Sequence, residues 1–223
     1  MDRNLLIQAL VKFISGVLVI AILLFIPAGT ILYPNAWLLM GVLFIPMFFA
    51  GIILMFKNPD LLRKRLNAKE KEAEQKNVII FSGLMFLCGF LAAGLDYRFQ
   101  WYILPEWFVI AAVLLFLFGY VLFAEVLREN EYLSRTVEVQ DNQKVIDTGL
   151  YSIVRHPMYM STLLLFLSMP LILGSLISFI IFMTYPVIIA KRIKNEEQIL
   201  EKGLEGYMEY KKKVKHKVIP FIW

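Results

Sequence analysis

Cysteine, histidine and charged residues are all scarce in this chain. Its 223 residues include one cysteine, Cys88, and two histidines, and 18% of them are charged. A single cysteine excludes an intramolecular disulfide, and no Cys/His spacing suits a metal ion, so we expect no metal site. Soluble domains average about 25% charged residues. The shortage of charge therefore points away from a soluble protein.

Several well-known functional motifs are also missing. The sequence has no Gly-x-Gly-x-x-Gly, no P-loop, no Gly-x-Ser-x-Gly and no His-Glu-x-x-His. Soluble dinucleotide-binding and hydrolase folds therefore have no support. The net charge of +5 is better assigned to membrane topology and lipid contact, and we expect no nucleic-acid binding.

Long apolar runs fill most of the chain, 59% of which is hydrophobic. The first four cover about residues 5–26, 36–56, 78–95 and 108–127. Each approaches the roughly 20 apolar residues that span a bilayer. A fifth run, 157–190, is too long for one straight crossing, and Pro170 and Gly174 interrupt it. We therefore predict an all-α, polytopic membrane bundle of about four transmembrane helices and a helical hairpin, whose arms either cross the bilayer or re-enter it.

The charged segments predict the orientation of the bundle. Lys and Arg are dense in residues 57–77 and after Ala190, whereas the loops near 27–35 and 96–106 hold one basic residue, Arg98. Because cytoplasmic loops carry excess positive charge, we place both termini and residues 128–156 in the cytoplasm. The predicted organisation is a set of N-terminal transmembrane helices, 1–127, and a region, 128–223, that holds the hairpin and a cytosolic tail.

The tail itself is rich in interleaved charges. Residues 191–213 are predicted to form a surface helix, and the lysines of 211–217 are expected to contact acidic phospholipid head groups. No signal-peptide cleavage site is visible after the first apolar run, so we expect that run to be retained.

Polar residues from both ends of the hairpin are expected to meet at the cytoplasmic face. Arg155, His156 and Tyr159 surround the start of its first arm, and the proline after His156 suits the first turn of a helix. Arg192 and Glu196 follow the second arm, four positions apart, and can share one helix face. A helix start favours a carboxylate or phosphate, a glutamate can bind ribose hydroxyls or an ammonium group, and an arginine can bind a carboxylate.

Three further polar residues lie on the predicted cytoplasmic side. Asn130 and Arg135, in the segment 129–140, are candidate substrate contacts or simple loop residues. Glu125 lies near the end of an apolar run, where an acid is a functional candidate by default, although a place at the water boundary would also explain it.

The string DTGLYSIVRHPMYMS, with RIKNEEQILEKGLEGYMEYKKKV and IPF after the apolar hairpin, resembles the isoprenylcysteine carboxyl methyltransferase family. The wider superfamily includes phospholipid N-methyltransferases. The resemblance covers about residues 125–221. It implies an integral membrane enzyme that uses S-adenosyl-L-methionine to methylate a lipid-like substrate, which enters sideways from the bilayer.

The resemblance also implies roles for individual residues. Contacts to the cofactor would come from Tyr151, Val154, His156 and Tyr159, and from Glu196 or Glu197 at its polar end. The candidate catalytic residues are Arg192, which would lie beside the reacting group, Arg155 and Glu196.

The residues leave the methyl acceptor open. A carboxylate is already ionised at about pH 7 and needs only a cation, Arg155 or Arg192, to orient it. An amine must lose a proton, so it needs a nearby glutamate or histidine as base. The motifs resemble the carboxyl-methylating branch more closely, which favours carboxyl O-methylation of an isoprenylcysteine-like substrate, with phospholipid N-methylation as the alternative.

A non-enzymatic membrane scaffold or small transporter is the alternative of another class. The first four apolar runs hold few charges, which gives a transport pathway little to use. The sequence does not indicate an oligomeric state.

Overall fold

Helices make up most of the chain in the computed structural model, which describes residues 2–67, 73–102, 104–134 and 136–223. No strand occurs within these ranges. The helices are α1 (Arg3–Ala28), α2 (Pro34–Lys57), α3 (Pro59–Leu66), α4 (Ala73–Phe99), α5 (Glu106–Glu129), the short 3-10 helix η1 (Gly149–Ser152), α6 (Pro157–Ile172), α7 (Leu176–Phe182), α8 (Tyr185–Gly203) and α9 (Tyr207–Lys213). The predicted all-α class is confirmed.

Within the described residues, 5 helices are long and apolar enough to cross a membrane. They are Arg3–Ala28, Pro34–Lys57, Gln75–Phe99, Glu106–Glu129 and Leu176–Gly203, the last of which joins α7 to α8. Their outer faces carry large exposed apolar side chains such as Val11, Phe49 and Leu114. A continuous apolar surface of this kind suits lipid rather than water. The chain is therefore a polytopic helical membrane bundle, as predicted.

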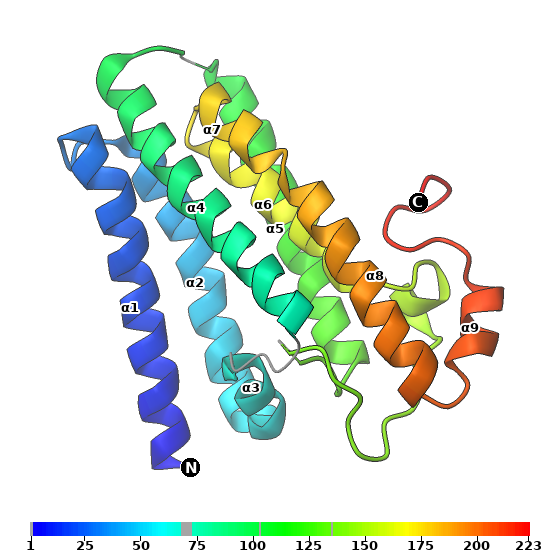
Figure 1. The fold of residues 1–223 in the computed structure, drawn as a ribbon. Helices are drawn as coiled ribbons and strands as arrows, with labels where there is room; N and C mark the ends of the chain where they lie inside the picture. The colour runs from blue at the N-terminus through cyan, green and yellow to red at the C-terminus, as the bar shows by residue number, and fades with distance from the viewer. Residues whose placement is uncertain (1, 68–72, 103, 135) are drawn as a thin grey trace.

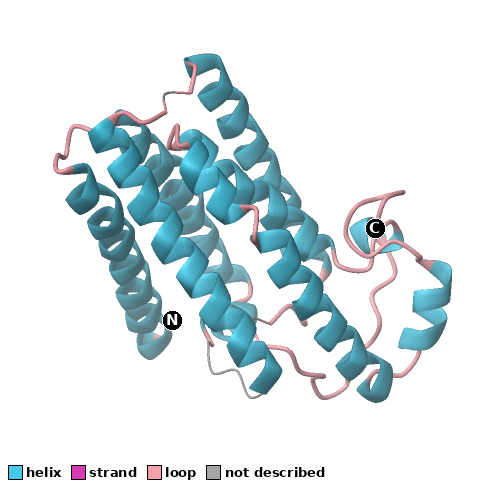
Figure 2. Ribbon diagram, turned by 45° about the horizontal axis from the view of Figure 1, so that its top comes forward, coloured by secondary structure: helices cyan, strands magenta, loops and turns pink. Residues whose placement is uncertain are grey.

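The helices lie side by side, with their ends gathered at two levels (Figure 1). One level holds the N-terminal end of α1, α3 and the C-terminal ends of α5 and α8, and we call it the cavity end. The other holds the connection between α1 and α2, the C-terminal end of α4, the start of α5 and the turn between α6 and α7; we call it the turn end. The bundle keeps this arrangement when it is tilted (Figure 2). Which end faces the cytoplasm stays a prediction.

The predicted hairpin reverses direction between α6 and α7. Gly174 has φ +78° in this turn, a conformation that glycine adopts without strain, and the Ser175 side chain caps α7 by accepting from Ser178 N at 3.1 Å. The two arms are unequal. With 16 residues, α6 is about 24 Å long, less than the roughly 30 Å of a hydrocarbon core, whereas α7 and α8 together reach spanning length.

Close helix contacts hold the hairpin against α4. A Cβ added at Gly89 would lie 2.3 Å from the Phe182 ring, so α4 and α7 approach through a glycine. The Phe182 ring meets Phe86 edge-on at a centroid distance of 5.3 Å, and Phe86 meets Phe166 of α6 at 4.9 Å. Interlocked rings of this kind fix α6 and α7 against α4, and the start of α6 carries part of the candidate site.

One feature of the predicted tail is wrong. The continuous helix expected over 191–213 ends at Gly203, and Gly206, with φ +80°, redirects the chain into α9. Beyond α9 the chain returns to the start of α6, where Arg155 N donates to His216 O at 3.0 Å and His156 N donates to Lys217 O at 2.8 Å. The tail therefore covers the Arg-His-Pro motif instead of extending away from it.

Candidate active site

Arg155 and Glu197 form the buried centre of the site. Arg155 Nε donates to Glu197 Oε1 at 2.8 Å, and the two side chains are 4% and 6% exposed. Arg155 Nη1 also donates to the carbonyls of Val214 at 2.7 Å and Lys215 at 2.8 Å. A buried charge is tolerated when it is paired and hydrogen-bonded in this way. Arg155 thus ties the start of α6 to both α8 and the returning tail.

Glu197 is surrounded by positive charge. Besides Arg155, the ammonium groups of Lys217 and Lys211 lie 3.5 Å and 3.7 Å from its Oε2. Both lysines follow α8 in the sequence, so Glu197 draws α9 and the tail toward the helix that carries it. This carboxylate holds the local fold together rather than facing open space.

His156 lies between two adjacent carboxylates. Its Nε2 is 3.3 Å from Glu197 Oε1, and its Nδ1 is 3.7 Å from Glu196 Oε1. The imidazole is 4% exposed, whereas Glu196 is 22% exposed. His156 therefore lies between the buried Glu197 and the more accessible Glu196.

Tyr159 connects Glu196 to Arg192. Its hydroxyl donates to Glu196 Oε2 at 2.5 Å and accepts from Arg192 Nε at 2.9 Å. The expected meeting of Arg192 and Glu196 on one face of α8 is found, with the phenolic oxygen between them. Polar contacts consequently run without a break from Arg192 through Tyr159, Glu196, His156 and Glu197 to Arg155, and we call this series the polar chain.

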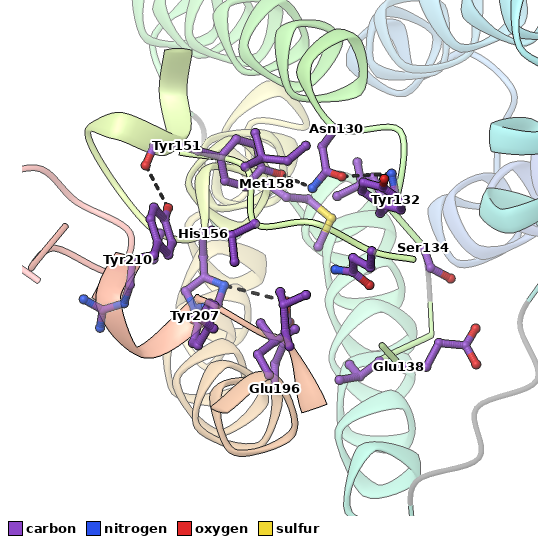
Figure 3. A pocket seen from close by; sticks show the side chains of 18 of the residues that line it. Asn130, Tyr132, Ser134, Glu138, Tyr151, His156, Met158, Glu196, Tyr207 and Tyr210 are labelled. Carbon is purple, nitrogen blue, oxygen red and sulfur yellow. Dashed lines mark hydrogen bonds and ion pairs between the residues drawn. The ribbon is translucent and has the colours of Figure 1, made fainter. Parts of the chain in front are cut away.

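The polar chain borders a cavity of about 110 Å³ that is partly open to solvent. Its lining comes from the motif, from α8 and α9, and from the irregular segment after α5: Asn130, Tyr132, Leu133, Ser134, Thr136, Val137, Glu138, Gln143, Lys144, Val145, Ile146, Tyr151, Arg155, His156, Met158, Tyr159, Arg192, Glu196, Leu200, Leu204, Tyr207 and Tyr210. Figure 3 shows His156, Glu196 and Tyr207 on one wall, facing Ser134 and Glu138 on the other.

Helix α3 supports the second wall. Lys64 Nζ donates to Glu131 O at 3.1 Å, and Arg65 Nη1 donates to Ser134 O at 3.3 Å. The Arg65 guanidinium also lies over the Phe123 ring of α5, 5.2 Å from its centroid. Two basic residues of the loop that predicted the membrane orientation therefore also position this wall.

Two tyrosines of α9 line the cavity and differ in the hydrogen bonding of their hydroxyl groups. Tyr210 Oη donates to Tyr151 O at 2.7 Å, whereas Tyr207 Oη is buried and has no hydrogen-bond partner among the described residues. Burial, reinforced by the Glu197 and Glu196 carboxylates, raises the pKa of Tyr207, so its hydroxyl stays protonated. An unsatisfied buried hydroxyl costs about 1–3 kcal/mol. Tyr207 is thus a donor in the cavity wall that lacks an acceptor.

Tyr151 is placed by contacts on both sides. Asn130 Nδ2 donates to Tyr151 Oη at 2.7 Å, and the preceding residue, Leu150, donates its backbone N–H to Glu129 at 3.0 Å. Gly149 makes this possible: its φ is +53°, and an added Cβ would lie 1.5 Å from Glu129 Oε1. Only glycine satisfies both conditions.

Most of the predicted site residues meet at this cavity. Those that line it are Asn130, Tyr151, Arg155, His156, Tyr159, Arg192 and Glu196. Val154 and Glu197 are buried, at 1% and 5% exposure, and are not among the described lining residues. Glu125 is 36% exposed and bonds to Arg128 Nε at 2.8 Å, away from the cavity. Arg135 lies outside the described residues.

Several lining residues were not predicted from the sequence, chiefly Tyr132, Thr136, Glu138, Tyr207 and Tyr210. The segment that carries the first three has no regular secondary structure, so no periodicity marks it. The string GYMEY offered a signal, because its two tyrosines lie three positions apart after a glycine and so share a face of a short helix.

Comparison with known proteins identifies two relationships. Residues 107–205, from the start of α5 to just beyond α8, match the model of the phospholipid methyltransferase family. The chain is also similar to the Delta(14)-sterol reductase of Methylotuvimicrobium alcaliphilum, with 26% identity over 135 residues, which are 54% of this chain and 32% of that protein. The chain therefore spans about a third of the length of this relative.

The two relationships are compatible. Both point to one superfamily of integral membrane proteins that includes methyltransferases and sterol reductases. This is the wider superfamily of the resemblance seen in the sequence; neither match distinguishes its isoprenylcysteine branch. The matched range holds the Arg-His-Pro motif, Arg192 and both glutamates of the polar chain.

Proposed function

We propose that the protein is an integral membrane methyltransferase that uses S-adenosyl-L-methionine to methylate a lipid-like acceptor. The observation that carries the proposal is the polar chain, which joins the start of α6 to α8 along one wall of the cavity. The match of residues 107–205 to the phospholipid methyltransferase family supports the reaction class.

The cavity suits this cofactor in the groups that line it. The cofactor carries a sulfonium, an ammonium and a carboxylate group. The cavity offers the carboxylate of Glu196, tyrosine faces that attract cations, and the Tyr207 hydroxyl, which lacks a partner among the described residues.

Each residue of the polar chain has a distinct part in the proposal. When bound, the cofactor supplies an electrophilic methyl group on its sulfonium. Glu196 binds the ammonium or ribose hydroxyls, held in place by the Tyr159 hydroxyl and by His156. Tyr207 donates to an acceptor group of the cofactor. Glu197 touches no ligand and acts by fixing His156, which makes it a positioning residue.

Carboxyl O-methylation of an isoprenylcysteine-like lipid is the preferred reaction. A carboxylate is ionised at about pH 7, so the site needs only to orient it and exclude water. Arg192 lines the cavity and is the better cation for this task. Arg155 is less suitable, because Glu197 and the carbonyls of Val214 and Lys215 already occupy its donors.

Phospholipid N-methylation is the alternative within the same class, and the name of the matching family favours it. An amine acceptor must be deprotonated before transfer. Glu196 and His156 are the available bases. The two reactions give different products, since a methyl ester is labile in base and an N-methyl lipid is stable.

The similarity to a sterol reductase favours a second candidate, reduction of a sterol with NADPH. Arg155, Arg192 and Lys144 line the cavity, together with the carboxylates of Glu138 and Glu196. Glu197 pairs with Arg155, and Lys211 and Lys217 lie 3.7 Å and 3.5 Å from the same carboxylate. NADPH carries a pyrophosphate and a further phosphate, which call for a clear excess of cations. The charge of the described residues does not separate the two cofactors, and the match to the phospholipid methyltransferase family favours S-adenosyl-L-methionine.

Calorimetry on the full chain in a neutral detergent tests the proposal. We expect S-adenosylhomocysteine to bind and NADPH not to bind. Methyl-labelled cofactor then separates the acceptors, with a farnesylcysteine analogue and phosphatidylethanolamine as substrates and base treatment of the products. Folded protein that binds neither cofactor would favour a non-enzymatic scaffold or transporter, and binding of NADPH alone would favour the reductase.

A further inference from the structure

A second cavity lies at the turn end of the bundle, far from the candidate active site. It has a volume of about 500 Å³ and is lined by the start of α2, the end of α4, the start of α5 and the turn between α6 and α7. In Figure 1 these elements lie at the upper end of the bundle, opposite α3. The methyltransferase proposal assigns this cavity no role.

Asp96 is the buried charged residue of this cavity. It is 2% exposed, its Oδ2 accepts from Ser175 Oγ at 2.5 Å, and its Oδ1 accepts from Tyr102 N at 3.0 Å. The Ser175 oxygen itself accepts from Ser178 N at 3.1 Å, so its proton is directed at Asp96. Each oxygen of the Asp96 side chain thus accepts a hydrogen bond.

No cation balances this carboxylate among the described residues. Lys, Arg and His are all missing from the described residues that line the cavity. Arg98, the basic residue nearest in sequence, lies over the Phe99 ring at 5.6 Å and is not one of them. Taking a carboxylate out of water without a positive partner is strongly unfavourable, and two neutral donors compensate only part of the cost.

The rest of the lining also suits a positive group. Glu106 adds a second carboxylate at the exposed side of the cavity, and Tyr97 and Tyr102 add aromatic rings. The Tyr97 ring is held in position, because it stacks on Tyr33 at a centroid distance of 4.0 Å and its hydroxyl donates to Leu32 O. Carboxylates beside tyrosine rings are the combination that binds ammonium groups.

We propose that the turn-end cavity binds an organic ammonium group, with Asp96 as its counter-ion. Two sources share this chemistry: a soluble amine and the head group of a zwitterionic phospholipid in the adjoining leaflet. A metal ion is a poorer occupant, because the described residues contain no group of three or more His, Cys, Asp or Glu side chains able to hold one. The inference does not depend on the methyltransferase proposal.

Titration of the full chain with choline, in a neutral detergent, tests this inference. We expect saturable binding that Asp96→Asn weakens by about tenfold or more, because the amide keeps the size of the side chain and loses its charge. Asp141→Asn, an exposed acid on the segment after α5, is the matched control and should bind as the wild type does. Failure of wild-type protein to bind choline, or equal affinity in Asp96→Asn, overturns the proposal.

Two additions make the result decisive. If Asp96→Asn does not fold, Glu106→Gln replaces it, since Glu106 is exposed; its loss should weaken choline binding about threefold, and an unchanged affinity again overturns the proposal. Nanodiscs of phosphatidylethanolamine or phosphatidylglycerol then separate the sources. Weaker Asp96-dependent binding of choline in phosphatidylethanolamine supports a lipid head group, whereas equal binding in both lipids supports a soluble amine.

Discussion

Glu196 and Glu197 are neighbours in the sequence but occupy different sides of the cavity wall. Glu196 is 22% exposed and lines the cavity. Glu197 is 6% exposed and contacts Arg155, His156, Lys211 and Lys217 behind it. The same chemical change at the two positions should therefore have different consequences.

Glu197→Gln should destabilise the protein by about 3 kcal/mol, because it leaves Arg155 buried without its counter-ion. Thermal melting in detergent measures the loss. Glu201→Gln is the control: Glu201 also contacts Lys211 but is 31% exposed, so its loss should cost less than about 1 kcal/mol. Equal melting of the two variants would contradict a structural role for Glu197.

Glu196→Gln should change ligand affinity rather than stability. Its melting temperature should stay close to that of the wild type, whereas S-adenosylhomocysteine should bind about tenfold more weakly, since a neutral amide attracts an ammonium group less than a carboxylate does. Calorimetry measures the affinity. Unchanged affinity in this variant would remove Glu196 from the cofactor site.

Tyr207→Phe should leave the free protein as stable as the wild type, or slightly more stable, because the deleted hydroxyl has no partner among the described residues. The extra stability that S-adenosylhomocysteine confers on the wild type should shrink. Tyr210→Phe is the matched control, since its hydroxyl bonds to Tyr151 O and its loss should cost about 1 kcal/mol without ligand. A large loss of stability in Tyr207→Phe, or an unaltered ligand effect, would show that this hydroxyl has another role.

Alkaline pH should destabilise the protein. Burial is the main cause that raises the pKa of Tyr151, Tyr207 and Tyr210 above that of an exposed tyrosine. Above about pH 10 the unfolded chain releases protons that the folded protein keeps. The protonated tyrosines therefore stabilise the folded protein fully below about pH 10. As the pH rises further, the free energy of unfolding falls by up to about 1.4 kcal/mol per pH unit for each tyrosine. Melting temperatures between about pH 8 and about pH 11 should show this fall, with a smaller slope in Tyr207→Phe; a flat profile would contradict it.

Gly149→Ala should disrupt the site, because the new Cβ would clash with Glu129 and the backbone has a positive φ. We expect a loss of several kcal/mol, in the range of strained and overpacked substitutions. Combining it with Glu129→Ala should recover the part due to the clash and leave the part due to φ, about 1 kcal/mol. Chemical denaturation of the two variants measures the difference, and no recovery in the double variant would refute a clash with Glu129.

The spans of the bundle were predictable because a bilayer imposes a simple rule. Every backbone polar group must be satisfied within an apolar helix, so hydropathy marks each helix directly. The run predicted over 108–127 is α5, Glu106–Glu129. The hairpin was predictable for a similar reason, since a proline and a glycine interrupt a run too long for one crossing.

The assembly of the site was only partly predictable. Local spacing placed Arg192 and Glu196 on one face, but nothing local indicates that Arg155 would bond to carbonyls 59 and 60 positions later in the chain. The hydrogen bond of Asp96 could not be predicted for the same reason, because its partner Ser175 lies 79 positions away. Contacts of this range come from tertiary packing, which hydropathy does not describe.

The backbone hydrogen bonds of Arg155 and His156 to His216 and Lys217 make two events distinct: the insertion of the helices into the membrane and the completion of the pocket. Hydropathy directs the apolar helices into the membrane, whereas the pocket also needs the returning tail. A chain truncated after α9 would keep every apolar helix of the described residues and yet lack the carbonyls of Val214 and Lys215 that hold Arg155 in place. Correct insertion of this protein is therefore no measure of whether its site has formed.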